Sequence, residues 1–117
     1  MDKKWKIIYY ETEKGDSPVF NFINGLELKA RTKVSNALDL LKEFGTKLGL
    51  PHSKKLIGTQ LWELRILGSN GIRILYIAMI GKNFLLIHGF QKKKQKAEIK
   101  EIKIAEKRLR EYKMRQK

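Results

Sequence analysis

Three apolar segments of strand length follow one another with only short turns between them, at residues 61–67, 72–80 and 84–91. The first turn, Gly-Ser-Asn-Gly at 68–71, is a strong hairpin signal, and Gly-Lys-Asn at 81–83 makes the second. In the first segment the side chains alternate, with Trp62, Leu64 and Ile66 on one face. Because turns this short join only strands that run in opposite directions, the sequence predicts a three-strand antiparallel meander.

Helical patterns precede and follow this meander. Apolar residues recur at three- and four-residue steps over 26–44, which is typical of an amphipathic helix. A shorter helix is expected to start at Pro18, with Ser17 as its N-cap, and to break at Gly25. From Glu98 onward, apolar residues occupy one side and Lys and Arg dominate the other, so a basic amphipathic helix is expected at the end.

The β-branched and aromatic segment 5–10 adds a first strand. The predicted fold is therefore α+β: an antiparallel sheet of an N-terminal strand and the meander, with a broken N-terminal helix and a C-terminal basic helix packed on one face of it. With 117 residues, the chain is expected to form a single domain, 1–117.

Composition excludes several classes of site. The chain has no cysteine, which rules out disulfides, thiolate nucleophiles and thiolate zinc sites and fits a reducing cytoplasm. Its two histidines, His52 and His88, have no acidic constellation near them, and phosphate-loop spacing is absent, so we expect neither a metal nor a nucleotide cofactor. The longest apolar run is about half a membrane span, and no signal peptide is indicated, so a cytoplasmic protein without a membrane segment is expected.

Charge gives the first indication of function. The chain has 26 Lys and Arg against 12 Asp and Glu, a formal net charge of +14. A field of this sign attracts polyanions, and in a cytoplasm the commonest polyanion is RNA or DNA. A surface for solubility and a surface that an acidic protein covers are the alternatives.

The most informative cations are those inside apolar strands, because burying a charge is costly unless it faces water or a partner. Arg65 and Arg73 flank the same hairpin, and Lys92 and Lys93 leave the end of the third strand. In a meander that end lies beside the start of the second strand, so Arg73 should lie near the level of Lys92, within one or two strand spacings of ~4.8 Å. Glu63 is either a plain ion-pair partner of Arg65 or part of this site.

Five further residues are candidates with open alternatives. His88 lies ~13 Å back along the third strand and is either a proton-transfer residue or a satisfied core histidine. Four lysines, before the first strand of the meander and after the third, extend this cationic face: Lys54, Lys55, Lys94 and Lys96. The lysine run after the third strand is also compatible with an ordinary solvated strand exit.

Five segments in this order resemble a known family. They are GDSPVFNFI (15–23), LWELR (61–65), RILY (73–76), HGFQKKKQK (88–96) and, in the last helix, Glu101, Ile102, Ala105, Arg108 and Tyr112. Together they resemble the RelE superfamily of type II toxins, specifically its HigB-like, phage-associated branch, over roughly residues 5–112.

That resemblance implies a small microbial-RNase-like fold and an mRNA interferase, a hydrolase that cleaves mRNA on translating ribosomes. A cognate helix-turn-helix, HigA-like antitoxin would neutralise it in a hetero-oligomer. Cleavage in such toxins proceeds by attack of a 2′-hydroxyl on the adjacent phosphate without a metal. Cations must then stabilise the charge that builds on the phosphorane, a task for which Lys and Arg are suited.

Carried over residue by residue, the resemblance implies that Arg73 and Lys93 bind the scissile phosphate. Arg65 or His88 would transfer a proton, with Lys92 assisting. The RNA backbone would be contacted by Lys54, Lys55, Lys94 and Lys96. Where some relatives have lysine, this chain has Glu63.

The last helix departs from the family pattern, because Lys-Ala-Glu at 96–98 replaces the usual Lys-Thr-Pro. Losing the threonine N-cap removes ~1 kcal/mol of helix stabilisation. Two alternatives to the toxin stay open. One is a non-catalytic basic RNA- or DNA-binding module, and the other is a protein-interaction domain that uses apolar residues outside the core stripes, such as Phe20 and Leu28.

Overall fold

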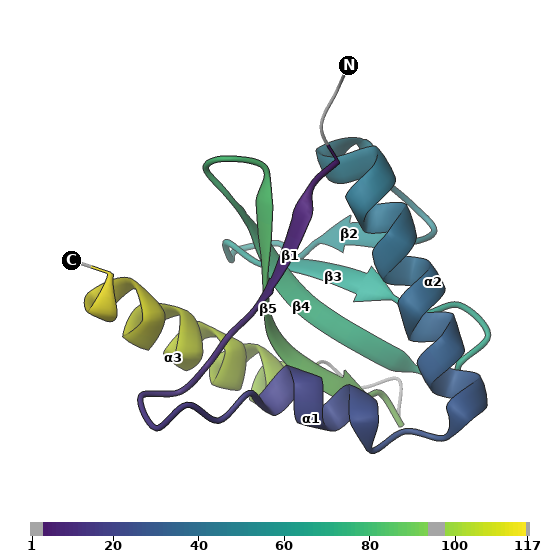
Figure 1. Ribbon diagram of the computed structural model, residues 1–117, viewed down its shortest axis with the longest axis horizontal. Coiled ribbons are helices and arrows are strands. Elements are labelled where there is room, and N and C mark those ends of the chain that lie inside the picture. The colour runs from purple at the N-terminus through teal and green to yellow at the C-terminus, as the bar shows by residue number, and fades with distance from the viewer. Residues whose placement is uncertain (1–3, 94–97, 117) are drawn as a thin grey trace.

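The computed structural model describes residues 4–93 and 98–116. A five-stranded sheet in the order β1-β5-β4-β3-β2 forms its centre, with α1 and α2 on one face and α3 on the other (Figure 1). The sequence predicted the helices on one face only, and that prediction is wrong because α3 has its own apolar layer against the sheet. The strands are β1 (Lys6–Tyr9), β2 (Ser53–Lys55), β3 (Trp62–Arg65), β4 (Ile72–Met79) and β5 (Asn83–Gln91). The helices are α1 (Pro18–Asn24), α2 (Leu28–Phe44), the short 3₁₀ helix η1 (Gly45–Lys47) and α3 (Ile99–Arg115).

The α+β fold and the meander are confirmed. β3 pairs antiparallel with β4, and β4 pairs antiparallel with β5, in a register that places Arg65 opposite Arg73 and Arg73 opposite Phe90. At the first turn Gly68, Asn70 and Gly71 all have positive φ, as this hairpin sequence favours. The sequence pattern therefore identified the three strands that carry most of the candidate site.

The sheet is mixed, where the sequence predicted only antiparallel pairs. β1 runs parallel to β5, with Ile7 opposite Phe84. No short turn joins β1 to its neighbour, so nothing in the local pattern fixed its direction. The short strand β2 has no counterpart among the predicted elements, because it has only three residues and follows Pro51 closely.

Helix starts differ slightly from the predictions. α1 begins at Pro18 as expected, but Ser17 makes no side-chain cap hydrogen bond. Gly25 ends α1 with φ −81°, in the right-handed region, so no left-handed glycine is needed there. α3 begins at Ile99, and Glu98 stands at its N-cap without a side-chain cap hydrogen bond.

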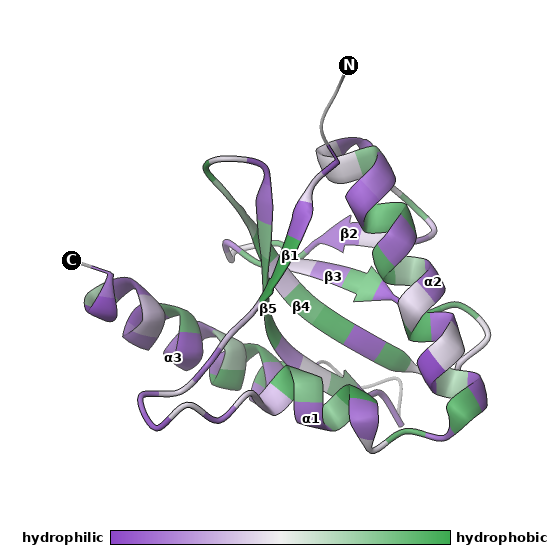
Figure 2. Ribbon diagram, in the orientation of Figure 1, coloured by the Kyte–Doolittle hydropathy of each residue, from purple (hydrophilic) through white to green (hydrophobic). Residues whose placement is uncertain are grey.

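Two apolar layers enclose the sheet. Leu64, Ile74 and Tyr76 face α1 and α2, whereas Leu75 and Phe90 face α3. In Figure 2, which colours each residue by hydropathy, β4 and β5 are largely hydrophobic, whereas α3 alternates between hydrophilic and hydrophobic residues. Along β3 and β4 successive side chains alternate between these two layers.

Helix α1 lies close to β5 because of one glycine. A Cβ at Gly89 would lie 2.6 Å from Cδ2 of Phe22, closer than side-chain atoms approach. The ring of Phe22 occupies this space and packs on the core between α1 and the sheet. Any side chain at position 89 would push α1 away from β5.

Candidate functional site: a basic cluster at the start of α3

Arg65 and Arg73 lie side by side on the α3 face of the sheet. They are cross-strand partners of β3 and β4, and their apolar neighbours Leu64 and Ile74 face the other layer. Two like charges directly opposite each other destabilise a sheet unless an anion compensates them. The anion in this structure is Glu63, two residues before Arg65 on the same face.

The carboxylate of Glu63 contacts both guanidinium groups. Its Oε1 lies 3.2 Å from Arg65 Nε and 3.9 Å from Arg73 Nε, while Arg73 Nη1 donates to the carbonyl of Ile72 at 3.1 Å. Glu63 is buried, but the side chains of Arg65 and Arg73 are 31% and 20% exposed. Glu63 is thus the ion-pair partner of Arg65 that the sequence suggested, and its buried carboxylate also compensates the charge of Arg73.

Lys92 is brought to this pair by the hairpin turn. Its backbone N–H donates to Gly71 O at 2.7 Å, and a Cβ at Gly71 would lie 2.4 Å from Lys92 O. Gly71 also has φ +95°, which side chains rarely adopt. Because Ile72 pairs with Gln91, Lys92 lies just beyond the start of β4, two residues past Phe90, which is the cross-strand partner of Arg73.

A second carboxyl group completes the cluster. Lys92 Nζ lies 3.2 Å from Oε1 of Glu98, whose side chain is only 11% exposed. Burial raises the pKa of Glu98, a hydrogen bond with Glu63 and the charge of Glu63 raise it further, and Lys92 acts in the opposite direction. We call Arg65, Arg73 and Lys92, with Glu63 and Glu98, the basic cluster.

His88 lies on the same face but is not free. It pairs with Leu75, is 8% exposed, and its Nε2 lies 2.7 Å from Glu101 Oε1. Arg108 Nη1 donates to its Nδ1 at 3.1 Å, so Nε2 carries the ring hydrogen and donates to Glu101. Burial lowers the pKa of His88. These contacts join β5 to α3 and favour the satisfied core histidine over the proton-transfer residue.

The predicted lysines fall in different places. Lys54 is exposed and opposite Glu63, so it borders the basic cluster. Lys55 pairs with Trp62 on the other face, where its ammonium group donates to Thr59 O. Lys93 is exposed and follows Lys92, and the predicted RNA contacts Lys94 and Lys96 lie outside the described residues.

Sequence reasoning missed two neighbours of the site. The sequence marks Glu98 only as a poor helix start, because no local pattern shows that its carboxyl group reaches Lys92. His52 was set aside as isolated, yet the N–H of Arg65 donates to His52 O at 2.7 Å. The next residue, Ser53, hydrogen-bonds to Tyr76 and therefore faces α2. Because successive side chains in an extended segment alternate between faces, His52 lies on the face of the basic cluster. Recognising β2 as a strand would have revealed it.

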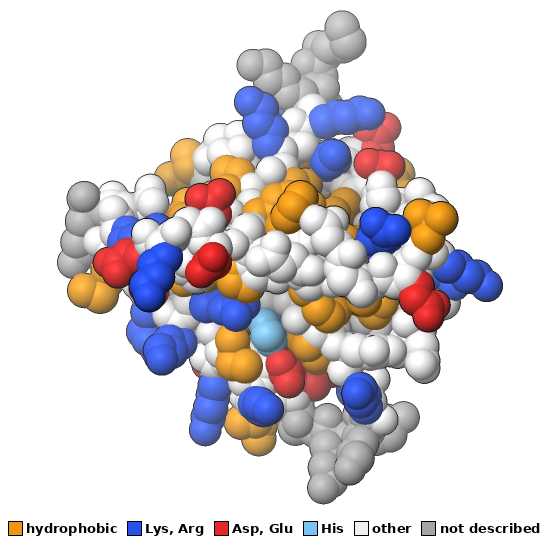
Figure 3. All heavy atoms as spheres, turned by 60° about the horizontal axis from the view of Figure 1, so that its bottom comes forward, with side chains coloured by type: hydrophobic (Ala, Val, Ile, Leu, Met, Phe, Trp, Pro, Cys, Tyr) orange, Lys and Arg blue, Asp and Glu red, His pale blue; other side chains and the backbone are white. Residues whose placement is uncertain are grey.

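The face near the start of α3 carries charges of both signs. In Figure 3 Lys and Arg side chains lie around its margin, with carboxylates and a histidine between them. Among the described residues, no three His, Asp or Glu side chains gather as a metal site would require. Throughout 4–93 and 98–116, no helix combines the length and the apolar character needed to cross a membrane.

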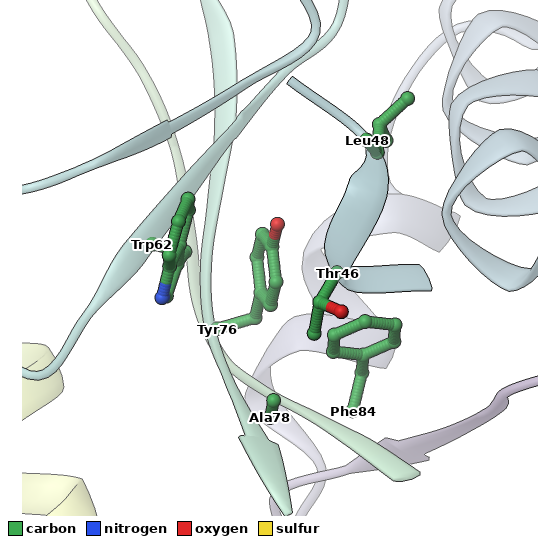
Figure 4. Close-up of a pocket in the computed structure, with 6 residues that line it drawn as sticks. All are labelled: Thr46, Leu48, Trp62, Tyr76, Ala78 and Phe84. Carbon is green, nitrogen blue, oxygen red and sulfur yellow. The ribbon is translucent and has the colours of Figure 1, made fainter. Parts of the chain in front are cut away.

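A small pocket lies on the opposite layer. It is lined by Thr46, Leu48, Trp62, Tyr76, Ala78 and Phe84 (Figure 4). These side chains carry no charge, and Trp62, Tyr76 and Phe84 belong to the core between the sheet and α2. The pocket is therefore separate from the basic cluster and unsuited to a phosphate.

Comparison with protein families places this geometry in context. A family model described as "Phage derived protein Gp49-like (DUF891)" matches residues 21–110, and no curated protein matches the chain significantly. The Gp49-like proteins are a toxin-antitoxin-related phage family, related to the RelE-type toxins, which are endoribonucleases. The match covers most of the chain and all of the basic cluster. The protein therefore belongs to the Gp49-like family of phage-derived proteins, within the RelE toxin group.

Proposed function

We propose that this protein is the toxin of a type II toxin-antitoxin system, a HigB-like endoribonuclease that cleaves mRNA on translating ribosomes in the cytoplasm. Membership of the Gp49-like family supports a toxin role. The observation that carries the proposal is the position of Arg65, Arg73 and Lys92, which come from three neighbouring strands and meet on one face of the sheet.

Cations in this arrangement suit metal-free phosphodiester cleavage. As the 2′-hydroxyl attacks, negative charge grows on the non-bridging oxygens, and preorganised donors lower the barrier most. Arg65 and Arg73 can donate two hydrogen bonds each to such oxygens, because a guanidinium group presents a planar fork. Glu63 holds both groups in place, so they need little rearrangement when RNA binds.

Proton transfer falls to other groups. The guanidinium group of Arg65 is a hydrogen-bond donor without an acceptor, so its part is electrostatic. With His88 engaged by Glu101 and Arg108, we assign it to the docking of α3. Lys92 belongs to the cluster, and His52 lies beside it. An amine and an imidazole are side chains that serve as general acids or bases, so we assign proton transfer to these two residues.

A toxin of this kind needs an antitoxin. We propose a HigA-like helix-turn-helix protein that forms a hetero-oligomer with this chain, in agreement with the family's link to toxin-antitoxin systems. Two apolar side chains that the core does not use are available for it, since Phe20 is 48% and Leu28 is 71% exposed. Both lie on α1 and α2, away from the face of the basic cluster.

The direct test is induced expression together with primer extension on a translating lysate. Wild type should arrest growth and produce cleaved messages. Arg73→Ala and Arg65→Ala should abolish both effects, and Arg73→Lys should retain part of the cleavage because it keeps the charge but loses the fork. Arg110→Ala, an exposed arginine of α3, is the matched control and should cleave normally. Circular dichroism checks folding, and folded Arg73 and Arg65 variants that cleave like wild type would refute the assigned site.

One observation favours a second candidate, a non-catalytic RNA- or DNA-binding module. Both ring nitrogens of His88 are occupied, so the basic cluster lacks the histidine that the resemblance offered for proton transfer. Salt-sensitive binding to RNA without any cleaved message in the lysate would select this function instead.

A further inference from the structure

Glu98 is placed unusually for a helix-capping residue. An N-cap side chain normally accepts a hydrogen bond from an amide in the first helical turn. Glu98 makes no such bond, although it stands at the N-cap of α3. Its carboxyl group instead lies against the sheet, 3.2 Å from Lys92 Nζ and close enough to Glu63 for that carboxyl group to raise its pKa.

The surroundings of Glu98 resemble those of a bound anion. Lys92 approaches it from the end of β5 and Glu63 from β3, and behind Glu63 stand Arg65 and Arg73 at 3.2 Å and 3.9 Å. A carboxylate and a phosphodiester both present charged oxygen acceptors to Lys and Arg. Two carboxyl groups therefore already occupy the three cations that would bind the RNA backbone.

A glutamine at position 98 could make the contacts of Glu98 without its charge. A glutamine at this position keeps an oxygen that can accept from Lys92 and gains N–H groups that can donate to Glu63. It also removes a negative charge next to the buried carboxylate of Glu63. A purely structural contact would be at least as favourable with the neutral side chain.

We propose that Glu98 is a resident competitor for RNA phosphate, which occupies Lys92 in the free protein and lowers the affinity of the basic cluster for the RNA backbone. The inference rests on the proposed function, because it assumes that this cluster is where RNA phosphate binds. A phosphate that enters the cluster takes the place of the Glu98 oxygen on Lys92, and the side chain of Glu98 turns away from the sheet.

The test compares Glu98→Gln with Glu43→Gln. Both raise the net charge by one, but Glu43 pairs with Lys4 at 3.6 Å in the last turn of α2, so it controls for charge alone. The probe is a fluorescein-labelled 2′-O-methyl oligouridylate, which cannot be cleaved by 2′-hydroxyl attack, and the readout is fluorescence anisotropy over a salt series. Removing a like charge next to a phosphate should tighten binding roughly 3- to 10-fold at low salt. The slope of log K against log salt should steepen by up to about 0.7.

A second pair of variants ties the gain to Lys92. In a Lys92→Met background, Glu98→Gln should tighten binding much less, because the cation that Glu98 occupies is gone. Equal affinities of Glu98→Gln and Glu43→Gln, or the same gain with and without Lys92, would overturn the proposal. A lower melting temperature of Glu98→Gln with unchanged affinity would also overturn it, since that result identifies a structural anchor. The outcome is independent of cleavage: if the ribonuclease activity is absent, the gain in affinity still appears.

Discussion

Replacing Glu63 by glutamine tests whether one buried carboxylate holds the two arginines of the basic cluster. Glutamine has nearly the same shape, so the change leaves no cavity and removes only the charge. Arg65 and Arg73 then face each other across β3 and β4 without compensation. In the wild-type protein, Oε1 of Glu63 lies 3.2 Å from Arg65 Nε and 3.9 Å from Arg73 Nε.

The expected loss of stability follows from burial. Breaking a fully buried ion pair by removing one partner destabilises a protein by about 3–5 kcal/mol. Here the arginines are 31% and 20% exposed, so water screens part of the repulsion, and relief of the contact with Glu98 offsets a further part. We therefore expect a loss of roughly 1.5–3 kcal/mol. For a chain of this length, that lowers the melting temperature by about 5–12 °C.

Urea unfolding followed by far-UV circular dichroism at pH 7 measures this loss. High salt should restore part of it in Glu63→Gln, because salt screens the repulsion between Arg65 and Arg73. Adding Arg65→Gln to Glu63→Gln should also recover stability, since only one guanidinium group then remains. An unfolding free energy of Glu63→Gln that stays within about 0.5 kcal/mol of wild type at low and high salt would refute the reasoning.

Two further predictions concern the contacts that hold the helices to the sheet. Burial lowers the pKa of His88 below 6.5, so on acidification the unfolded chain protonates this imidazole before the folded protein does. The unfolding free energy of wild type should therefore fall as the pH drops through 6.5. Urea unfolding at pH 7.5, 6.5 and 5.5 should show a weaker dependence of this free energy on pH in His88→Gln. An identical pH dependence in the two proteins would contradict this. Gly89→Ala places a Cβ 2.6 Å from Phe22 and should destabilise by about 1–3 kcal/mol. Phe22→Leu in the same background should recover part of that loss, and a double variant less stable than Gly89→Ala alone would count against the packing argument.

Local sequence patterns predicted those parts of the structure that local physics decides. Short turns fixed the meander, and with it the register of Arg65 and Arg73, because a hairpin leaves no freedom in strand direction. Three-to-four periodicity gave α2, since one apolar stripe must face the core. β1 was predicted as a strand, but its parallel pairing with β5 was not. The two strands are far apart in the sequence, so no local turn fixes their relative direction.

The misses within the site arise from contacts between distant elements. A bulge at Leu75/Tyr76 puts Ile87 and His88 on the same face, which strict alternation does not predict. His88 then meets Glu101 and Arg108 of α3, and no spacing along the chain signals that meeting. The Glu98 contact with Lys92 likewise depends on where α3 docks.

The outer position of β1 has a consequence for handling the protein at high concentration. β1 has a strand neighbour on one side only, and lies at the front of the sheet in Figure 1. The N–H of Trp5 is covered by the carbonyl of Lys42, but a strand at the rim of a sheet leaves further backbone groups open to pairing with another molecule. Exposed Lys4 and Lys6 stand along this rim. Two copies that approached rim to rim would bring these ammonium groups together, so mutual repulsion keeps the molecules dispersed, and added salt weakens that protection against fibre-like stacking.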